Sequence, residues 1–347
     1  MHRALELLFN ESVYFALRDG THIEGGVFIG GTEFLPLEVL TDDIDAYQAE
    51  ANAWLNEVWN PGQEEARSQI LALHSNQNRY RELQEATKRQ QVVPFVGSGM
   101  SVQSGLPVWS ELLRKLRTNT MIEPTELEEL LNRSEFEEAA DLVVSGMNRN
   151  LFDEQLQYNL RIDSPENIAG AVRLIPAIFS GTIVTTNLDN ILEIHHGVCA
   201  CDFDYVLLTH DLRRYRPLKS TGSRFLLKLH GDYCRPETRV LLTAEYEVAY
   251  GTGSEVRAEL SLLYRNNNLL FMGCSLGPDR TVRLIDEVAR EANSMPKHYA
   301  FLKSPDSDVA RIEREGFLTS RRVYPIWYEG DHDTSIMALL SGLIDEQ

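Results

Sequence analysis

The sequence predicts an α/β protein built on a doubly wound, mainly parallel β-sheet. From Val92 onward, short apolar runs rich in β-branched residues recur without alternating with polar residues. Such runs are typical of strands that are covered on both faces, as the strands of a parallel sheet are. The runs also alternate with segments of helical periodicity, and this order of elements is that of a doubly wound sheet.

Seven segments are predicted as strands, and helices are predicted between them. The strand segments are 92–97, 182–187, 224–231, 239–243, 268–276, 298–303 and 323–328. Helical periodicity is clearest over 255–266, 280–293 and 308–317. Residues of about 110–178 show amphipathic helical patterns without a strand pattern, so we expect a helical insertion that packs beside the sheet.

The chain before the sheet is expected to be a small N-terminal β/α region, so that residues 1–91 and 92–347 form separate units. Residues 1–50 are predicted to be rich in β-structure, because three turn-forming pairs separate short apolar runs. These pairs are Asp19-Gly20, Gly25-Gly26 and Gly30-Gly31. The region carries no recognisable chemistry, so packing or contact within an oligomer is its expected role.

Two helices are predicted in the second half of this region. The first covers 43–60 and is expected to end at Pro61-Gly62, since proline interrupts helical hydrogen bonding. The second covers about 64–91 and has a narrow apolar face that includes Ile70 and Tyr80.

The composition excludes several classes of function. Of 347 residues, 33 are Lys or Arg and 52 are Asp or Glu, which gives a formal net charge of −19. Such a charge repels phosphate backbones, so direct contact with nucleic acid is not expected. The longest apolar run is about half of the ~20 residues that span a bilayer, and the first residues lack the pattern of a signal peptide. We therefore expect a cytoplasmic protein without membrane contact.

The four cysteines do not indicate a metal site. Cys199, Cys201, Cys234 and Cys274 include no CxxC pair, so the sequence predicts neither a zinc ribbon nor a disulfide framework.

The first candidate site follows the predicted strand at 92–97. Gly97-Ser98-Gly99 joins this strand to a predicted helix start, where glycines allow a phosphate to approach the backbone closely. Ser98 and Ser101 add hydroxyl groups. A plain tight turn has the same pattern, and the third glycine of the dinucleotide fingerprint is missing at the usual spacing.

Three more predicted strands end in polar residues. These residues are Asn187 and Asp189, then His230 beside Gly231, and then Gly273 and Ser275. Each has a structural alternative: an Asn-x-Asp segment also caps helices, and a lone histidine is more often structural. The other histidines, His332 among them, lack polar neighbours that suggest a site. Because ligands of open α/β sheets bind at the carboxyl ends of strands, the four motifs together predict a cleft at this edge.

Together these motifs resemble those of the sirtuin-like (SIR2-like) family of NAD-binding proteins. The segment from Gly97 to Pro107 matches the pattern Gly-Ala-Gly-x-Ser-x-x-Ser-Gly-x-Pro except that serine replaces the alanine. The family's Asn-x-Asp, His-Gly and Gly-x-Ser motifs are matched at Asn187–Asp189, His230–Gly231 and Gly273–Ser275. The resemblance covers roughly residues 92–330.

The chain departs from the protein deacylases of that family. They carry Asp-Phe-Arg after the proline and a zinc module with two CxxC pairs, whereas this chain has Val108-Trp109-Ser110 and no CxxC pair. It looks instead like the bacterial sirtuin-like effectors of antiphage defence, in the branch that lacks the zinc module. The resemblance implies a Rossmann-like, sirtuin-type fold and an NAD glycohydrolase that depletes NAD in infected cells.

The resemblance also implies a role for each site residue. Asn187 would bind the nicotinamide ribose and help to orient water, and His230 would take a proton from a ribose hydroxyl or from water. Asp189 would hold the carboxamide of nicotinamide. The diphosphate would be bound by Gly97, Ser98, Gly99 and Ser101, and the adenosine ribose by Gly273 and Ser275. The resemblance implies that NAD is the substrate, and it implies no metal.

Two other functions stay open, namely a non-catalytic regulatory subunit that binds NAD or ADP-ribose and, less favoured, a protein deacylase. The resemblance implies partners as well, which in this family include HerA-like ATPases, Argonaute-type proteins and fused sensor domains. We expect a homo-oligomer that docks to a separate trigger subunit, with a HerA-like ATPase as the first expectation.

Overall fold

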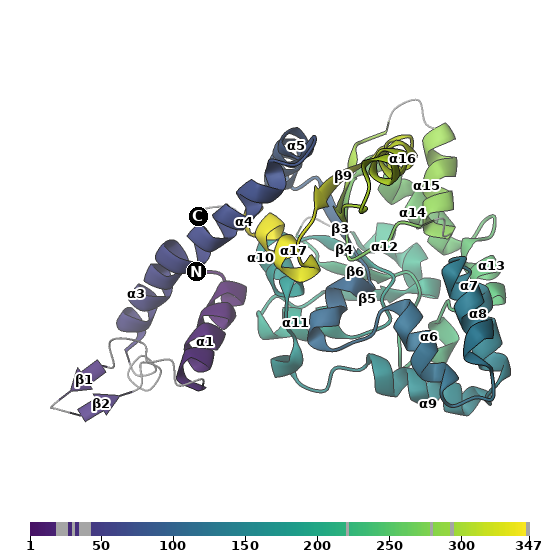
Figure 1. Ribbon diagram of the computed structural model, residues 1–347, viewed down its shortest axis with the longest axis horizontal. Coiled ribbons are helices and arrows are strands. Elements are labelled where there is room, and N and C mark those ends of the chain that lie inside the picture. The colour runs from purple at the N-terminus through teal and green to yellow at the C-terminus, as the bar shows by residue number, and fades with distance from the viewer. Residues whose placement is uncertain are drawn as a thin grey trace.

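The computed structural model describes residues 1–18, 27–29, 32–34, 43–219, 222–277, 280–291 and 295–344. A seven-stranded sheet lies at its centre, in the order β5-β6-β4-β3-β7-β8-β9. Every neighbouring pair is parallel. Helices flank the sheet (Figure 1). The doubly wound α/β fold that the sequence predicts is therefore confirmed.

The strands are short and their residues are mostly buried. Their bounds are Tyr205–Leu208 (β5), Phe225–Lys228 (β6), Thr182–Thr185 (β4), Val92–Val96 (β3), Asn268–Met272 (β7), His298–Lys303 (β8) and Val323–Tyr328 (β9). All residues of β3 are buried, with Val92 and Val96 in one apolar cluster and Val93 and Phe95 in another. Two cores, one on each face of the sheet, explain why the sequence does not alternate with polar residues.

One predicted strand is wrong and one strand was not predicted. Residues 239–243 lead without a strand into helix α13 (Thr243–Tyr250). The Leu241 and Leu242 amides donate to the Glu245 carboxylate, so a side chain replaces a strand partner for them. Strand β5 gave no signal because it is short and lies at the sheet's edge, where Val206 is exposed.

The chain between β3 and β4 contains helices and no strand in the described residues 97–181. These helices are α6 (Trp109–Arg117), α7 (Pro124–Asn132), α8 (Phe136–Ser145), α9 (Arg149–Leu160) and α10 (Ile175–Ile178). The first four share an apolar cluster that is separate from the two cores of the sheet and includes Leu113, Leu127, Val143 and Leu156. The helical insertion therefore has an apolar core of its own.

The start of the chain is helical, which corrects the β-rich expectation for residues 1–50. Helix α1 (Arg3–Arg18) buries Ala4, Leu5, Leu8 and Phe9, whose spacing follows one helical face. A two-stranded antiparallel sheet, β1 (Val27–Ile29) and β2 (Thr32–Phe34), is the β-structure that is described here. The three predicted turn pairs lie outside the described residues.

The helix over residues 44–71 continues past Pro61, so the predicted stop there is wrong. Helix α3 (Ile44–Trp54) passes through a π-helical turn (Leu55–Trp59) into α4 (Asn60–Leu71). Pro61 comes just after the π-helical turn, so its missing amide falls where the helical hydrogen-bond pattern changes. The predicted helix over 64–91 is divided, because α4 ends at Leu71 and α5 covers Asn76–Lys88.

The remaining α-helices follow β4 in the chain and alternate with the later strands. They are α11 (Ile191–Val198), α12 (Tyr215–Leu218), α14 (Glu255–Asn266), α15 (Arg280–Glu291), α16 (Asp308–Thr319) and α17 (His332–Ser341). The predicted helices at 255–266, 280–293 and 308–317 are thus confirmed. Helices α1, α3 and α4 extend to one side of the sheet, with β1 and β2 at the far end (Figure 1). Among the described helices, none has both the length and the apolarity to cross a membrane.

Candidate active site at the carboxyl edge of the sheet

The four motifs follow four strands that are neighbours in the sheet. The order β6-β4-β3-β7 places them side by side although they are far apart in the sequence. Thr185 of β4 lies opposite both Lys228 of β6 and Val96 of β3, and Val96 also lies opposite Met272 of β7. The carboxyl ends of the four strands are therefore level with one another.

The predicted site residues lie just after the last residues of these four strands. Gly97 and Gly273 follow the last residues of β3 and β7 directly, while Asn187 and His230 come two residues after β4 and β6. One edge of the sheet thus presents glycine turns, an amide and an imidazole in sequence. This edge is the place where ligands bind in open α/β sheets.

Three of the predicted residues are joined by hydrogen bonds. The Ser101 hydroxyl donates to Asp189 Oδ2 at 2.8 Å and accepts from Asn187 Nδ2 at 3.1 Å. The second carboxylate oxygen of Asp189 accepts from the Ile191 amide at the start of α11. All three side chains are buried. Burial raises the pKa of Asp189, and the nearby Lys228 charge opposes that rise. Ser101 is therefore a link between Asn187 and Asp189 in this structure.

The glycines allow two strand ends to touch. The Gly97 amide donates to the Met272 carbonyl, and the Gly99 amide donates to the Gly273 carbonyl at 3.0 Å. A Cβ at Gly97 would lie 2.5 Å from the Gly273 oxygen, and one at Gly273 would lie 2.5 Å from the Met100 nitrogen. The amides of Gly97 and Gly99 thus bond to the backbone of β7 and its turn, and the role of this turn in binding a diphosphate stays a prediction.

His230 is held by helix α13. Its Nε2 atom lies 2.8 Å from the Tyr250 hydroxyl, and the Tyr246 ring packs edge-on against the imidazole. Burial lowers the pKa of His230 to about 3, so the imidazole is neutral near pH 7. The Tyr250 hydroxyl also lies 3.2 Å from Thr281 Oγ1. No local pattern indicates a role for Tyr250, because two tyrosines at helical spacing are typical of ordinary core residues.

A buried lysine connects the strands that carry Asn187 and His230. Lys228 Nζ donates to the Asp189 carbonyl at 2.7 Å and forms ion pairs at 2.7 Å with Glu193 and Asp232. Its side chain is fully buried. Because Lys228 precedes His230 by two residues, these bonds fix the turn after β4 relative to the catalytic candidate. The two carboxylates keep the pKa of Lys228 raised against the effect of burial.

Two further groups support the edge from behind. Arg314 of α16 donates to the carbonyls of Ser275 and Leu276 and so holds the turn after β7. His332, the first residue of α17, lies beside Gly99: a Cβ on that glycine would be 3.0 Å from His332 Nε2. This position corrects the expectation that His332 has no polar company.

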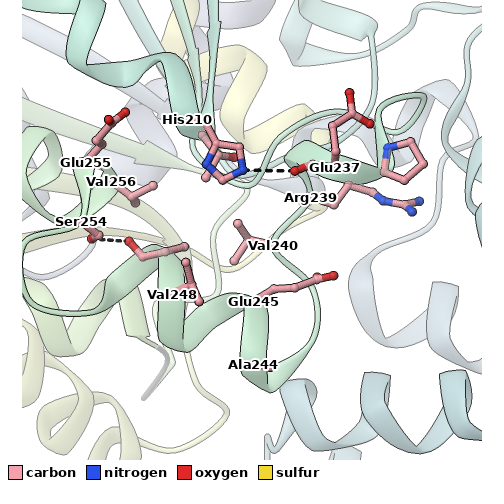
Figure 2. A pocket seen from close by; sticks show the side chains of 13 residues that line it. His210, Glu237, Arg239, Val240, Ala244, Glu245, Val248, Ser254, Glu255 and Val256 are labelled. Atoms are coloured by element: carbon pink, nitrogen blue, oxygen red, sulfur yellow. Dashed lines mark hydrogen bonds between the residues drawn. The ribbon is translucent and has the colours of Figure 1, made fainter.

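A cavity of about 510 Å³ lies against α13 (Figure 2). It is lined by Ala244, Glu245, Val248 and Ala249 of α13 and by residues of the segments 209–210, 236–240 and 254–256. Tyr246 and Tyr250 leave the opposite face of the same helix, towards His230. None of the predicted site residues lines this cavity, so it is distinct from the strand-end site.

The described residues contain no group of three His, Cys, Asp or Glu side chains that could hold a metal ion.

Comparisons with known proteins find a family domain and a relative that are similar to part of this chain. A family model described as a SIR2-like domain matches residues 181–326, the segment that carries Asn187, His230 and Gly273. "Defense-associated sirtuin 2" of Bacillus subtilis is 24% identical over 242 residues, which are 69% of this chain and 23% of that protein. The chain thus spans less than a quarter of the length of this curated relative. Residues 181–326 thus match a SIR2-like domain, and the chain is similar to a defence-associated sirtuin over 69% of its length.

Proposed function

We propose that this protein is an NAD glycohydrolase, which cleaves NAD to ADP-ribose and nicotinamide. The observation that carries the proposal is the position of His230 and Asn187 after the neighbouring strands β6 and β4, with the glycine turn after the next strand. A protein that only binds a dinucleotide needs the close backbone approach but has no need of a neutral base. The SIR2-like family match supports NAD as the substrate.

The cleavage of NAD does not require a general acid from the protein. Cleavage between nicotinamide and ribose passes through an oxocarbenium-like state, and nicotinamide leaves as a neutral molecule. His230, neutral because of its burial, accepts a proton from a ribose hydroxyl or from water. Asn187 binds the ribose and helps to orient the water, and Asp189 holds the carboxamide. The absence of a zinc module from the sequence disfavours the alternative of lysine deacylation.

The biological role that we propose is NAD depletion in antiphage defence. The relative from Bacillus subtilis is named a defence-associated sirtuin, which supports this role. A toxic activity of this kind requires control, so we propose a cytoplasmic homo-oligomer that is activated by a separate trigger subunit, with a HerA-like ATPase as the first candidate. The N-terminal region, residues 1–91, is our candidate for the oligomer contact. A strictly monomeric mass in light scattering would contradict the oligomer.

The test is release of nicotinamide from NAD, followed by chromatography with and without the candidate trigger protein. We expect His230→Ala and Asn187→Ala each to abolish release, while circular dichroism shows an intact fold. His210→Ala is the matched control, because His210 is exposed and its ring contacts the Glu237 carbonyl away from the strand-end site. Undiminished turnover in both site variants would remove the mechanism. Binding of ADP-ribose without any cleavage of NAD would favour the regulatory subunit instead.

A further inference from the structure

His332 lies directly behind the glycine turn of the proposed NAD site. A Cβ on Gly99 would meet the Gly273 Cα at 2.8 Å and His332 Nε2 at 3.0 Å. The imidazole therefore packs against the same backbone that joins β3 to β7. The Nε2 atom is buried, and its polar neighbour is the Gly99 backbone, which favours the protonated ring by hydrogen bonding. The charge of this imidazole is therefore coupled to the glycine turn.

None of the predicted site residues supplies positive charge for a phosphate, and the nearby cations Lys228 and Arg314 are bonded to protein oxygen atoms. Ser101 and Asn187 are neutral, Asp189 is a carboxyl, and His230 is neutral because of its burial. The chain as a whole carries a formal charge of −19. A dinucleotide brings two more negative charges on its diphosphate. A cation close to the glycine turn would offset this repulsion, since charges interact strongly where water is excluded.

The hydrogen bond between His332 and Tyr328 is compatible with both charge states of the imidazole. The Tyr328 hydroxyl forms a hydrogen bond with His332 Nδ1. A phenol can donate to the neutral ring and can equally accept from the protonated one. Both charge states therefore keep this bond, and protonation leaves Nε2 as a donor that faces the Gly99 backbone.

The charged groups around His332 are of both signs. Asp331 and Asp333 belong to the turn that begins α17, Lys303 comes from β8, and Tyr328 comes from β9. Burial lowers the pKa of His332, the two aspartates and a hydrogen bond to the Gly99 backbone raise it, and Lys303 lowers it further. With burial as the largest cause, the pKa of His332 lies below its ordinary value in the free protein.

We propose that His332 is a positioning residue that takes up a proton when the diphosphate of a dinucleotide binds on the Ser98–Ser101 turn. The inference rests on the proposed function, because it names a residue that serves the same site. The imidazolium would act through the Gly99 backbone and would not touch the ligand. Since the bound state then holds one more proton than the free state, affinity must fall as the pH rises.

The experiment is calorimetric titration of the full chain with ADP-ribose at pH 6.0 and pH 8.0. ADP-ribose carries the diphosphate but cannot release nicotinamide, so binding is measured without turnover. We expect wild-type protein to bind roughly 3- to 10-fold more tightly at pH 6.0, because one unit of pKa shift corresponds to a factor of ten. His332→Gln keeps a neutral donor near the Nε2 position, and its affinity should be nearly the same at both pH values.

Three controls make the result specific. His210→Gln changes an exposed histidine away from the site and should keep the wild-type dependence on pH. Adenosine lacks the diphosphate, so any binding should not vary with pH in this range. Tyr328→Phe leaves His332 in place but removes the acceptor for its Nδ1 proton, so the ratio of affinities should shrink. This variant keeps the test valid if His332→Gln fails to fold.

The outcomes separate the two proposals. Wild-type affinity that does not change with pH, or a His332→Gln variant that retains the full change, overturns the role of His332 and leaves the NAD site standing. Wild-type protein that binds neither ADP-ribose nor NAD at either pH overturns the proposed function, and the role of His332 with it.

Discussion

The Nε2 atom of His230 lies 2.8 Å from the hydroxyl oxygen of Tyr250, which in turn lies 3.2 Å from the Thr281 hydroxyl. These three side chains join the end of β6 to α13 and to the start of α15. A neutral imidazole carries one N–H and one acceptor nitrogen. When the Nε2–H of His230 donates to Tyr250, Nδ1 is the nitrogen that remains to accept a proton from the substrate.

The first prediction concerns the Tyr250 hydroxyl. Tyr250→Phe should lower kcat for nicotinamide release by about 3- to 30-fold, because a loosely held imidazole spends less time in the reactive orientation. KM should change little, since Tyr250 holds the base and not the diphosphate. The measurement is steady-state release of nicotinamide from NAD.

Tyr215→Phe is the control for this substitution. Tyr215 is also buried, and its hydroxyl bonds to Thr182 at the amino end of β4, away from the site. Its removal should leave kcat unchanged. If Tyr250→Phe also retains the wild-type kcat, Tyr250 does not position His230.

The second prediction concerns Lys228. Lys228→Met leaves Glu193 and Asp232 without their buried cation, so the free energy of unfolding should fall by ~3–5 kcal/mol at pH 7. Without that cation, the pKa values of both carboxyl groups should rise in the folded variant. Groups with a raised folded pKa stabilise the fold as the pH falls, so the deficit should shrink between pH 7 and pH 5.

Urea unfolding at several pH values checks this prediction. Arg114→Met removes one partner of an exposed pair with Glu128 and should change stability little at any pH. A Lys228→Met deficit that is constant or grows towards acid pH would contradict the assigned role of the two carboxylates.

The sheet could be predicted because its strands are covered on both faces. Segments such as 92–97 and 268–276 have no polar face, so their character is visible in the sequence alone. The segment 239–243 has the same composition, yet its amides bond to the Glu245 carboxylate, a tertiary contact that no local pattern reveals. The turn pairs that follow residues 3–18 dominate the local pattern, so the sequence indicates β-structure where the chain is helical.

The site could be predicted where it depends on strand ends, and not where it depends on packing between distant elements. Asn187 and His230 follow apolar runs, so their place at the sheet edge follows from the fold. Tyr250 and His332 come from helices whose approach to that edge is decided by tertiary structure. The tyrosine spacing and the isolated histidine carry no local signal of this approach.

The third prediction tests the close contact of the glycine turn. Gly97→Ala should lower the free energy of unfolding by ~1–3 kcal/mol, because its Cβ would lie 2.5 Å from the Gly273 oxygen and 2.7 Å from Cys274 Sγ. Affinity for ADP-ribose should fall as well, since the turn must shift. Gly62→Ala is the control: no atom beyond the adjacent helix backbone lies within 4 Å of the added carbon, and this helical position should gain ~0.5–1 kcal/mol. Equal stabilities of the two variants in urea would contradict the contact.

The last prediction concerns the attachment of the N-terminal helices to the sheet. Asn76 is fully buried at the start of α5, and its side-chain amide donates at 2.7 Å to the carbonyls of Ile70 and Trp327. Its Oδ1 atom accepts from the Trp327 amide at 3.0 Å. Because β9 is the last strand of the sheet, Asn76 occupies backbone groups that an edge strand would otherwise leave unpaired.

Asn76→Ala should therefore lower the free energy of unfolding by ~2–4 kcal/mol, since it leaves several buried backbone groups without partners. Asn76→Asp should be more harmful still, because a carboxylate would face the two carbonyl oxygens that the amide now satisfies. That order separates hydrogen bonding from packing, as aspartate has nearly the shape of asparagine. Asn78 is exposed, so Asn78→Ala serves as the control in the same urea titrations. A loss below ~0.5 kcal/mol for Asn76→Ala would show that the N-terminal helices are held to β9 by other contacts.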